Sequence, residues 1–326
     1  MSILVTGSAG HLGEALMRTL QKRSILARGI DLKQSPFTNM SGSLSDRAFV
    51  ARAMEGIDTV LHTATLHKPH VVTHTRQDFV DTNITGTLNL LEECRTRTMK
   101  AFVFTSTTST FGDAMRPQPG GPAVWVDEDV VPITKNIYGV TKLAAENLCR
   151  LAHTSNRLPT IILRTSRFFP EDDDAKTVRQ AYSMENAKVN ELLARRADIA
   201  DVVSAHLCAA ERARDIGYGM YIVSATPPFT RNDLQGLTQN APDIVERHVP
   251  FKGVYEKKGW SMFPAIERVY DNSRARKALG WEPALDFSTA LNKIEKDQPI
   301  FSLLTDEVGK KGYHDEVFED GPFPVE

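Results

Sequence analysis

The sequence is short of cysteine. Its 326 residues include three, Cys94, Cys149 and Cys208, which stand far apart in helix-like segments and form no Cys-x-x-Cys pair. This usage excludes a disulfide framework and a zinc knuckle, and it is typical of small buried residues in a reducing compartment. We therefore expect a cytoplasmic protein.

Long apolar runs and an excess of charge of one sign are also missing. No apolar stretch approaches the roughly 18–20 residues of a membrane span. The N-terminus shows no charged leader before an apolar segment, so we expect no signal peptide. Lysine and arginine (39) nearly balance aspartate and glutamate (41), for a net charge of −2. We expect neither nucleic acid nor a membrane as the main partner.

What the first half does contain is an alternation of short apolar runs with amphipathic helical patterns. Strands are predicted over residues 3–5, 25–31, 59–61, 101–104 and 160–163, and helices over 14–23, 47–54, 85–96 and 138–152. Such alternation predicts an α/β fold, a Rossmann-type doubly wound parallel sheet. Ligands bind beyond the carboxyl ends of its strands, so informative residues are expected there.

The second half has a mixed pattern. We expect a Rossmann domain over residues 1–165 and a smaller mixed substrate lobe over 166–326, with some later segments returning to the sheet. Further predictions in this half are a loop at 168–174, one helix at 190–212, a strand at 220–223 and a helix at 272–279, then a surface tail from about residue 298.

A glycine-rich turn follows the first strand, with the sequence Thr-Gly-Ser-Ala-Gly-His-Leu-Gly from residue 6. Its GxxGxxG spacing allows a tight turn, close approach of the backbone to a pyrophosphate, and packing of helix on strand. Free N–H groups at the helix start then hold the anion. We assign dinucleotide binding to Gly7, Gly10, His11, Leu12 and Gly13.

Asp31 ends the second predicted strand. A carboxylate there accepts hydrogen bonds from ribose hydroxyls and repels a 2′-phosphate, which favours NAD over NADP. The flanking cations Arg28 and Lys33 argue for NADP. NAD is the cofactor we expect.

Tyr138 and Lys142 lie four residues apart on one predicted helix and therefore share a face. A free tyrosine, with a pKa near 10, is a poor base, and a nearby ammonium lowers that pKa. The pair suits proton transfer at an alcohol or ketone oxygen. Residues 105–112 place a cluster of hydroxyls directly after a buried strand, although Ser109 and Thr110 are also explained as turn residues.

Together these motifs make the sequence resemble the extended short-chain dehydrogenase/reductase family, of the sugar-nucleotide epimerase and dehydratase type. The resemblance rests on six segments in order, at residues 6–13, 58–64, 83–87, 105–112, 138–142 and 279–283. It implies that Tyr138 is the catalytic acid/base, that Lys142 tunes it and holds the nicotinamide ribose, and that Thr107 is the catalytic hydroxyl.

The same resemblance implies the remaining contacts. It places Ser43 and Leu44 at the adenine and Ala64 on the pyrophosphate side. Further cofactor contacts are expected from Thr63, Thr65, Asn83, Thr105, Ser106, Thr165 and Ser166, and substrate contacts from His67, Thr107, Thr108 and Arg167. A homodimer through the helices around residues 88–94 and 144–151 is also implied.

Two departures from the family pattern concern the substrate. Arg167 stands where nucleotide-sugar enzymes carry an asparagine, and the lobe that follows is short. Thr108 stands where a dehydratase would carry an acid, which argues against elimination. We hypothesise that Arg167, with Arg195 or Arg196, binds an anionic group; the alternative is a structural ion pair with residues 171–174.

Four histidines, His62, His67, His70 and His74, match no metal-ligand spacing. We expect no metal, and His67 or His70 at the substrate mouth or in a solvated loop. The sequence thus predicts an NAD-dependent oxidoreductase or epimerase acting on a small carbohydrate-like molecule, either a sugar, a sugar acid or a sugar nucleotide. The alternative is a non-catalytic protein that senses NAD(H).

Overall fold

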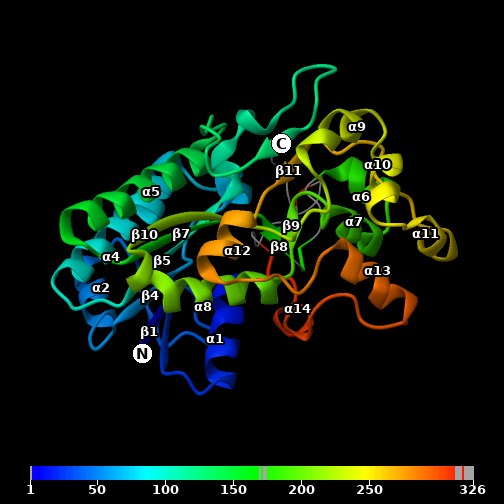
Figure 1. Cartoon of the computed structure of the whole chain (residues 1–326). Helices are drawn as coiled ribbons and strands as arrows, with labels where there is room; N and C mark the ends of the chain where they lie inside the picture. The colour runs from blue at the N-terminus through cyan, green and yellow to red at the C-terminus, as the bar shows by residue number, and fades with distance from the viewer. Residues whose placement is uncertain (1, 169, 172–174, 313–317, 319–326) are drawn as a thin grey trace.

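The computed structural model describes residues 2–168, 170–171, 175–312 and 318. Its centre is a sheet of seven parallel strands in the order β10-β7-β5-β4-β1-β2-β3 (Figure 1). The strands are β1 (Ile3–Thr6), β2 (Ala27–Asp31), β3 (Met40–Ser41), β4 (Thr59–His62), β5 (Ala101–Thr107), β7 (Thr160–Thr165) and β10 (Tyr218–Val223). The Rossmann-type fold predicted from the sequence is confirmed.

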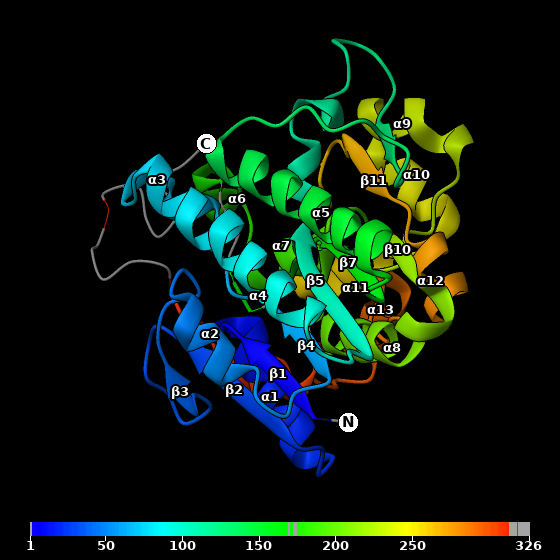
Figure 2. The same ribbon diagram turned by 90° about the vertical axis from the view of Figure 1, so that its left-hand side faces the viewer.

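Helices cover both faces of the sheet because alternate strand residues point to opposite sides. One face carries α1 (His11–Lys22), α8 (Ile199–Ile216), α12 (Ser273–Leu279) and α14 (Leu303–Val308). The other carries α2 (Arg47–Ala53), α4 (Gly86–Arg95) and α5 (Ile137–Asn156). Figure 2 shows α4 and α5 in front of the strands. Ile3 and Val5 pack into the first face, and Leu4 packs into the second.

A smaller lobe builds its own apolar core beside the carboxyl edge of the sheet. It contains α7 (Met184–Glu191), α9 (Leu234–Gln239), α10 (Ala241–His248), α11 (Lys252–Lys258), α13 (Phe287–Glu295) and the paired strands β6 (Val124–Val126) and β11 (Arg268–Tyr270). Short elements complete the fold: α3 (Arg76–Phe79), α6 (Lys176–Ala181), β8 (Arg167–Phe168) and β9 (Arg196–Ala197). Strand β10, late in the chain, pairs with β7 of the main sheet.

The single helix expected over residues 190–212 is wrong. Helix α7 ends at Glu191, β9 pairs with β8, and α8 begins at Ile199. The Asp198 side chain accepts a hydrogen bond from the Ala200 amide at 2.8 Å and caps α8, so the chain restarts there. Periodicity alone does not reveal the two-residue pairing that separates the helices.

The expected surface tail is also corrected. Residues 303–308 form α14, in which Thr305 and Val308 are buried. The Ser302 and Thr305 hydroxyls donate to the Asp198 carboxylate at 2.5 and 3.2 Å. The tail is therefore packed against the N-terminus of α8.

Candidate functional site

The glycine turn has the geometry that a pyrophosphate requires. Gly7 has a φ of +73°, and a Cβ there would lie 2.8 Å from the Ala64 amide nitrogen. A Cβ on Gly13 would lie 1.8 Å from the Gly7 carbonyl oxygen. Helix α1 begins at His11, earlier than predicted, and its N-cap residue Gly10 offers no side-chain cap. The turn therefore fits the phosphates of a dinucleotide.

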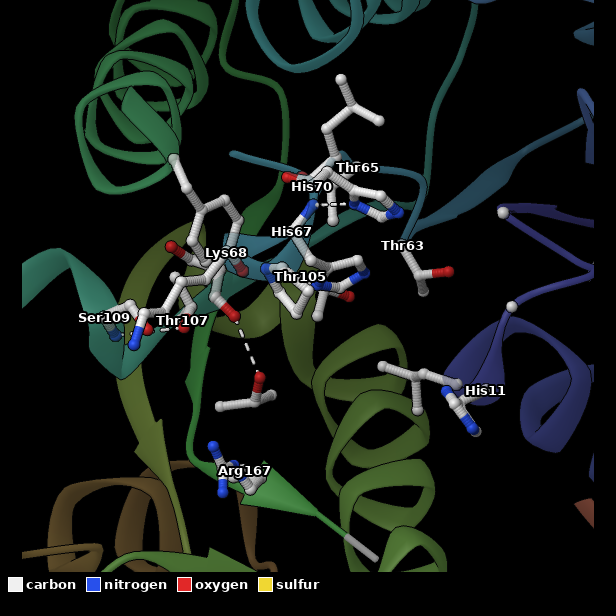
Figure 3. Close-up of a pocket in the computed structure, with 18 of the residues that line it drawn as sticks. His11, Thr63, Thr65, His67, Lys68, His70, Thr105, Thr107, Ser109 and Arg167 are labelled. Carbon is white, nitrogen blue, oxygen red and sulfur yellow. Dashed lines mark hydrogen bonds between the residues drawn. The ribbon is translucent and has the colours of Figure 1, made fainter. Parts of the chain in front are cut away.

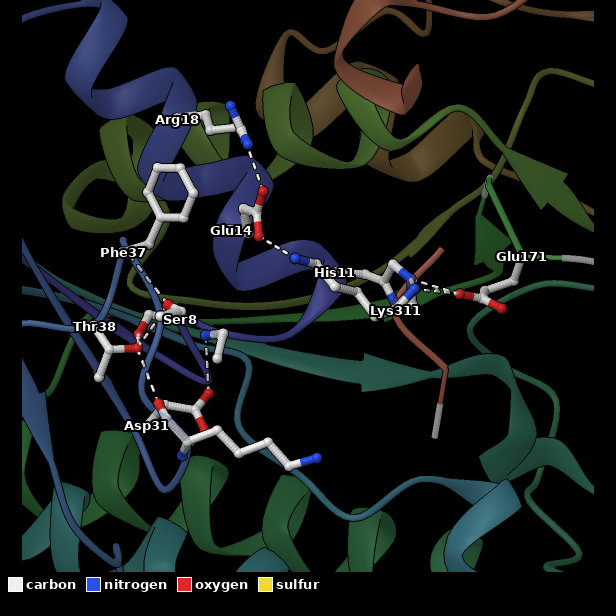
Figure 4. A network of polar contacts seen from close by, with 12 residues as sticks. Ser8, His11, Glu14, Arg18, Asp31, Phe37, Thr38, Glu171 and Lys311 are labelled. Atoms are coloured by element: carbon white, nitrogen blue, oxygen red, sulfur yellow. Dashed lines mark hydrogen bonds and ion pairs between the residues drawn. The ribbon is translucent and has the colours of Figure 1, made fainter. Parts of the chain in front are cut away.

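Asp31 lies at the end of β2, beside this turn (Figure 4). Its carboxylate accepts hydrogen bonds from the backbone amides of Ala9, at 3.0 Å, and Lys33, at 2.9 Å. Arg28 points elsewhere, because its guanidinium donates to the carbonyls of Ala53 and Glu55. Of the two cations that argue for NADP, Lys33 therefore lies beside Asp31 and Arg28 does not.

A cavity of about 990 Å³ runs from the turn along the carboxyl ends of the strands. Most residues singled out from the sequence line it. Of the residues expected to contact the cofactor, those on its wall are Gly7, Gly10, His11, Leu12, Gly13, Asp31, Ser43, Leu44, Thr63, Ala64, Thr65, Thr105, Ser106, Tyr138, Thr165 and Ser166, and of those expected to contact the substrate, His67, Thr107, Thr108 and Arg167.

Asn83 and Lys142 lie one layer behind that wall. Asn83 belongs to a π-helical turn, Val80–Thr85, and its side chain is fully engaged within the protein. It accepts hydrogen bonds from the Thr65 hydroxyl (2.9 Å) and the Leu66 amide (2.8 Å), and it donates to the Leu66 carbonyl (3.2 Å) and the Thr141 hydroxyl (3.0 Å). Asn83 thus ties the loop after β4 to helix α5.

Tyr138, in the first turn of α5, lines the cavity together with Thr107 at the end of β5. Burial raises the pKa of Tyr138 to about 12, and the contact with Thr107 opposes this rise. Lys142 was expected to lower the pKa of Tyr138, but burial has the larger effect and raises it. At neutral pH the Tyr138 hydroxyl carries its proton.

Lys142 is 2 % exposed and donates a hydrogen bond of 2.6 Å to the Thr105 carbonyl. Its Nζ atom lies 4.0 Å from the centre of the Phe104 ring. Burial lowers the pKa of Lys142 to about 7, although the Glu146 carboxylate one turn later opposes that shift. The amine is therefore fixed to the strand end next to Tyr138.

Glu146 joins α5 to two strands through a buried network. Its Oε1 accepts hydrogen bonds from the Ser106 hydroxyl at 2.6 Å and Arg164 Nε at 3.0 Å, and its Oε2 accepts from Arg164 Nη2 at 2.7 Å. The side chains of Glu146, Arg164 and Ser106 are all almost completely buried. The network holds the helix that carries Tyr138 and Lys142 against β5 and β7.

The part of the cavity where the substrate is expected is rich in basic side chains. Figure 3 shows His67, Lys68 and His70 grouped near Thr107, with Arg167 across the cavity from them. The centres of the His67 and Tyr138 rings lie 5.9 Å apart. Burial lowers the pKa of His67 to about 3. The other basic residues on this wall are Arg116, Lys135, Arg195 and Arg268.

The arginines near β8 have different surroundings. Arg196 is fully buried, forms an ion pair with Glu191 and donates to the Glu171 carbonyl, so it is structural. Arg195 lines the cavity and lies 2.9 Å from the other Glu191 oxygen. The alternative for Arg167 was an ion pair with residues 171–174. Of these, Glu171 pairs with His11, and residues 172–174 lie outside the described residues.

The histidines do not gather around a common centre. His62 is buried, with Nδ1 at 2.7 Å from the Thr6 hydroxyl and Nε2 at 2.9 Å from the Thr87 hydroxyl. His70 Nδ1 accepts a hydrogen bond from the His67 amide. Within the described residues no three histidine, cysteine or acidic side chains are grouped as metal ligands would be.

Comparison with known proteins decides the family. The model of the "NAD dependent epimerase/dehydratase family" matches residues 3–223. The chain belongs to this family. It is an NAD-dependent enzyme, consistent with the fit of the glycine turn and Asp31 to that cofactor.

Relatives of this epimerase/dehydratase-family enzyme have diverse names. A 3 beta-hydroxysteroid dehydrogenase/Delta 5→4-isomerase of Mycobacterium tuberculosis is 27% identical over 89% of this chain and 88% of its own length. An uncharacterized UDP-glucose epimerase of Bacillus subtilis is 32% identical over 50% of this chain and 55% of its own.

Solved structures share the fold of the enzyme. A short-chain dehydrogenase/reductase superfamily protein from Agrobacterium tumefaciens with bound NAD superposes with a TM-score of 0.64 at 22% identity, covering 91% of this chain and 96% of that one. UDP-glucuronic acid 4-epimerase from Bacillus cereus in complex with NAD gives 0.61 at 22% identity, covering 92% and 100%.

The structure also brings residues to the cavity of the enzyme that the sequence did not reveal. Lys311 and Gly312, from the tail, line the cavity. The Lys311 amide lies 2.7 Å from His11 Nε2, and its amine pairs with Glu14 (Figure 4). The Glu171 carboxylate lies 2.5 Å from the same His11 nitrogen. Burial raises the pKa of Glu171, but His11 and Lys311 hold it below its usual value.

No local motif announces these contacts, since about 300 residues separate His11 from Lys311. Arg268 was missed for a related reason: it is one of three residues in a short strand without a helical or glycine signal. No helix in the described part of the enzyme is both long and apolar enough to cross a bilayer.

Proposed function

We propose that this enzyme oxidises or epimerises a hydroxyl-bearing carbon of an anionic carbohydrate, with Tyr138, Thr107 and Lys142 at the reacting centre. The observation that carries the proposal is that Tyr138 and Thr107, from the start of α5 and the end of β5, line the same cavity that begins at the glycine turn. NAD, when bound, supplies the hydride acceptor.

Each member of the trio has a distinct task in this proposal. In the reductive direction Tyr138 donates its phenol proton to the carbonyl oxygen of the substrate. In the oxidative direction Tyr138 must first lose that proton, and the phenolate then accepts the proton of the substrate hydroxyl. Thr107 positions the same oxygen by a second hydrogen bond. Lys142 acts through Tyr138: its link to the Thr105 carbonyl fixes the helix turn that presents the phenol.

The character of the cavity favours a charged sugar over a sterol. A sterol site needs predominantly apolar walls with few polar groups. Here the substrate side presents Lys68, Arg116, Lys135, Arg167, Arg195 and Arg268, together with the hydroxyls of Thr108 and Ser109. Such a wall favours a carboxylate or phosphate on a polar, compact molecule.

The test is a panel of neutral aldoses, uronic acids, sugar phosphates, sugar nucleotides and a 3β-hydroxysteroid, followed by NADH absorbance and by product analysis. Net NADH formation identifies a dehydrogenase. Conversion of one epimer into another with NAD retained identifies an epimerase. Turnover of the steroid but of no sugar would contradict the proposed substrate class, and no turnover at all would favour a protein that senses NAD(H).

Tyr138→Phe is the informative variant in this assay. We expect it to lower turnover by about 10²- to 10⁴-fold, because it removes the transferable proton and little else. Tyr182→Phe is the matched control, since Tyr182 packs on Phe263 and does not line the cavity. Equal activity of wild type and Tyr138→Phe would remove Tyr138 from the mechanism.

We also propose a homodimer through the outer faces of α4 and α5, working in the cytoplasm. Leu88 is 39% exposed and Leu151 57% exposed, whereas Leu91 and Cys94 face the core. Sedimentation analysis of Leu151→Glu tests the first point, with a shift from dimer to monomer as the expected result. A monomeric wild type would contradict it.

A further inference from the structure

Arg268 stands out among the basic residues of the cavity. It lies in β11, whose residues alternate between two environments. Val269 is fully buried in the core of the lobe, while Arg268 and Tyr270, on the opposite face, line the cavity. The side chain of Arg268 is therefore directed to the substrate side by the pleat of the strand.

The strand itself is held firmly. It pairs in parallel with β6, with Arg268 opposite Val124. The Val124 amide donates to the Glu267 carbonyl at 2.9 Å, and the Asp271 amide donates to the Val126 carbonyl at 2.9 Å. Tyr270 donates through its hydroxyl to the Met115 sulfur at 3.2 Å. A side chain on such a strand starts from a fixed position, as a recognition residue must.

The neighbouring cations have acidic partners. Arg116 and Lys135 share the Asp113 carboxylate, at 3.3 and 3.1 Å, and Arg195 pairs with Glu191. Arg268 makes no ion pair with the described residues, and its Nε atom is buried without a hydrogen-bond partner. The charge of Arg268 is therefore not paired with an acid of the described residues, and a bound anion would pair with it.

We propose that Arg268 is a specificity-determining residue that binds the anionic group of the substrate, a carboxylate or phosphate oxygen pair, on the cavity wall shared with Arg167. This rests on the proposed function and adds the residue that selects the substrate. A guanidinium presents parallel N–H groups that match two oxygens of either anion, and the Arg268 side chain lines the cavity where the anion would lie.

The experiment compares wild type with Arg268→Gln on matched substrates: glucuronate and glucose 1-phosphate as anions, and glucose as the neutral molecule. We expect KM for at least one anion to rise on the order of 10- to 100-fold, with glucose changed by less than about twofold. The anion whose KM rises shows whether Arg268 binds a carboxylate or a phosphate. Arg231→Gln, on the outside of the same lobe where Arg231 pairs with Asp127, is the matched control.

A binding measurement separates this inference from the proposed reaction. Glucuronate and glucose 1-phosphate are titrated calorimetrically into the NAD-loaded protein. If wild type turns over nothing but binds an anion that Arg268→Gln does not, the anion site stands and the proposed reaction fails. If turnover occurs and Arg268→Gln affects glucose and the anions equally, or none of them, the anion site is overturned and the proposed reaction stands.

Discussion

Lys142 Nζ donates a 2.6 Å hydrogen bond to the backbone carbonyl of Thr105, so the lysine of helix α5 is tied to strand β5 two residues before Thr107. The link connects the two elements that carry the proposed reacting groups. It also gives Lys142 a structural task beside any electrostatic one, because a buried amine needs an acceptor.

Replacing Lys142 by methionine should separate these tasks from that of Tyr138. We expect Lys142→Met to lower kcat on the order of 10²-fold, since the phenol loses its fixed position. If Lys142 acts through Tyr138, the double variant with Tyr138→Phe is no slower than Tyr138→Phe alone. Multiplicative losses in the double variant would show that Lys142 acts independently of Tyr138.

The glycine turn makes a sharp prediction about NAD affinity. In Gly13→Ala the added Cβ would meet the Gly7 carbonyl at 1.8 Å, so helix α1 must move away from the turn. We expect NAD affinity to fall tenfold or more, on the order of 1.4 kcal/mol, in a fluorescence titration. Gly253→Ala, within α11 and with open space around its Cβ, should bind NAD as wild type does. Equal affinity of both variants would show that the turn does not hold the cofactor.

Asp31 should set the choice between NAD and NADP. Asp31→Asn retains an oxygen that accepts a hydrogen bond from Ala9 but removes the negative charge that repels a 2′-phosphate. The ratio of the two dissociation constants should therefore move toward NADP by about tenfold, roughly 1.4 kcal/mol. Lys33→Gln is the paired variant, because it removes the neighbouring cation and should shift the ratio the other way or leave it unchanged. A shift toward NADP in Lys33→Gln would contradict this reasoning.

His206 should make the protein sensitive to mild acid. Burial lowers the pKa of His206 to about 4, and its Nε2 lies 2.7 Å from the Thr105 hydroxyl. The native state therefore binds fewer protons than the unfolded state between about pH 4 and 6.5, and the free energy of unfolding decreases as pH falls through that window. At about pH 5.5 the loss is about 1.4 kcal/mol for this residue.

The measurement is thermal unfolding at about pH 7.5 and about pH 5.5. His206→Gln should lose less stability between the two conditions than wild type, even if it is less stable at both. His74→Gln changes an exposed histidine and serves as the control. An unchanged pH dependence in His206→Gln would assign the acid sensitivity to other buried groups.

The cofactor half of the enzyme was readable from local sequence. Strand, turn and helix signals stand in order around Gly7 and Gly13; Gly13 is required by its contact with the nearby Gly7 carbonyl, and Gly7 by its positive φ. The spacing of Tyr138 and Lys142 puts them on one helix face whatever the rest of the chain does. Short apolar runs likewise predicted the strands of the main sheet other than the two-residue β3, because these strands are buried between two helix layers.

Tertiary structure decided what local patterns do not encode. The sequence suggested that Lys142 lowers the pKa of Tyr138, but burial dominates and raises it. Asn83 proved to brace a loop from behind the cavity, and Arg196 proved to be an internal ion-pair partner. The positions of Arg268 and Lys311 depend on a strand pairing and a tail docking, each made with residues more than a hundred positions away. Burial and long-range contacts set charge states and cavity walls, and they exist only once the chain has folded.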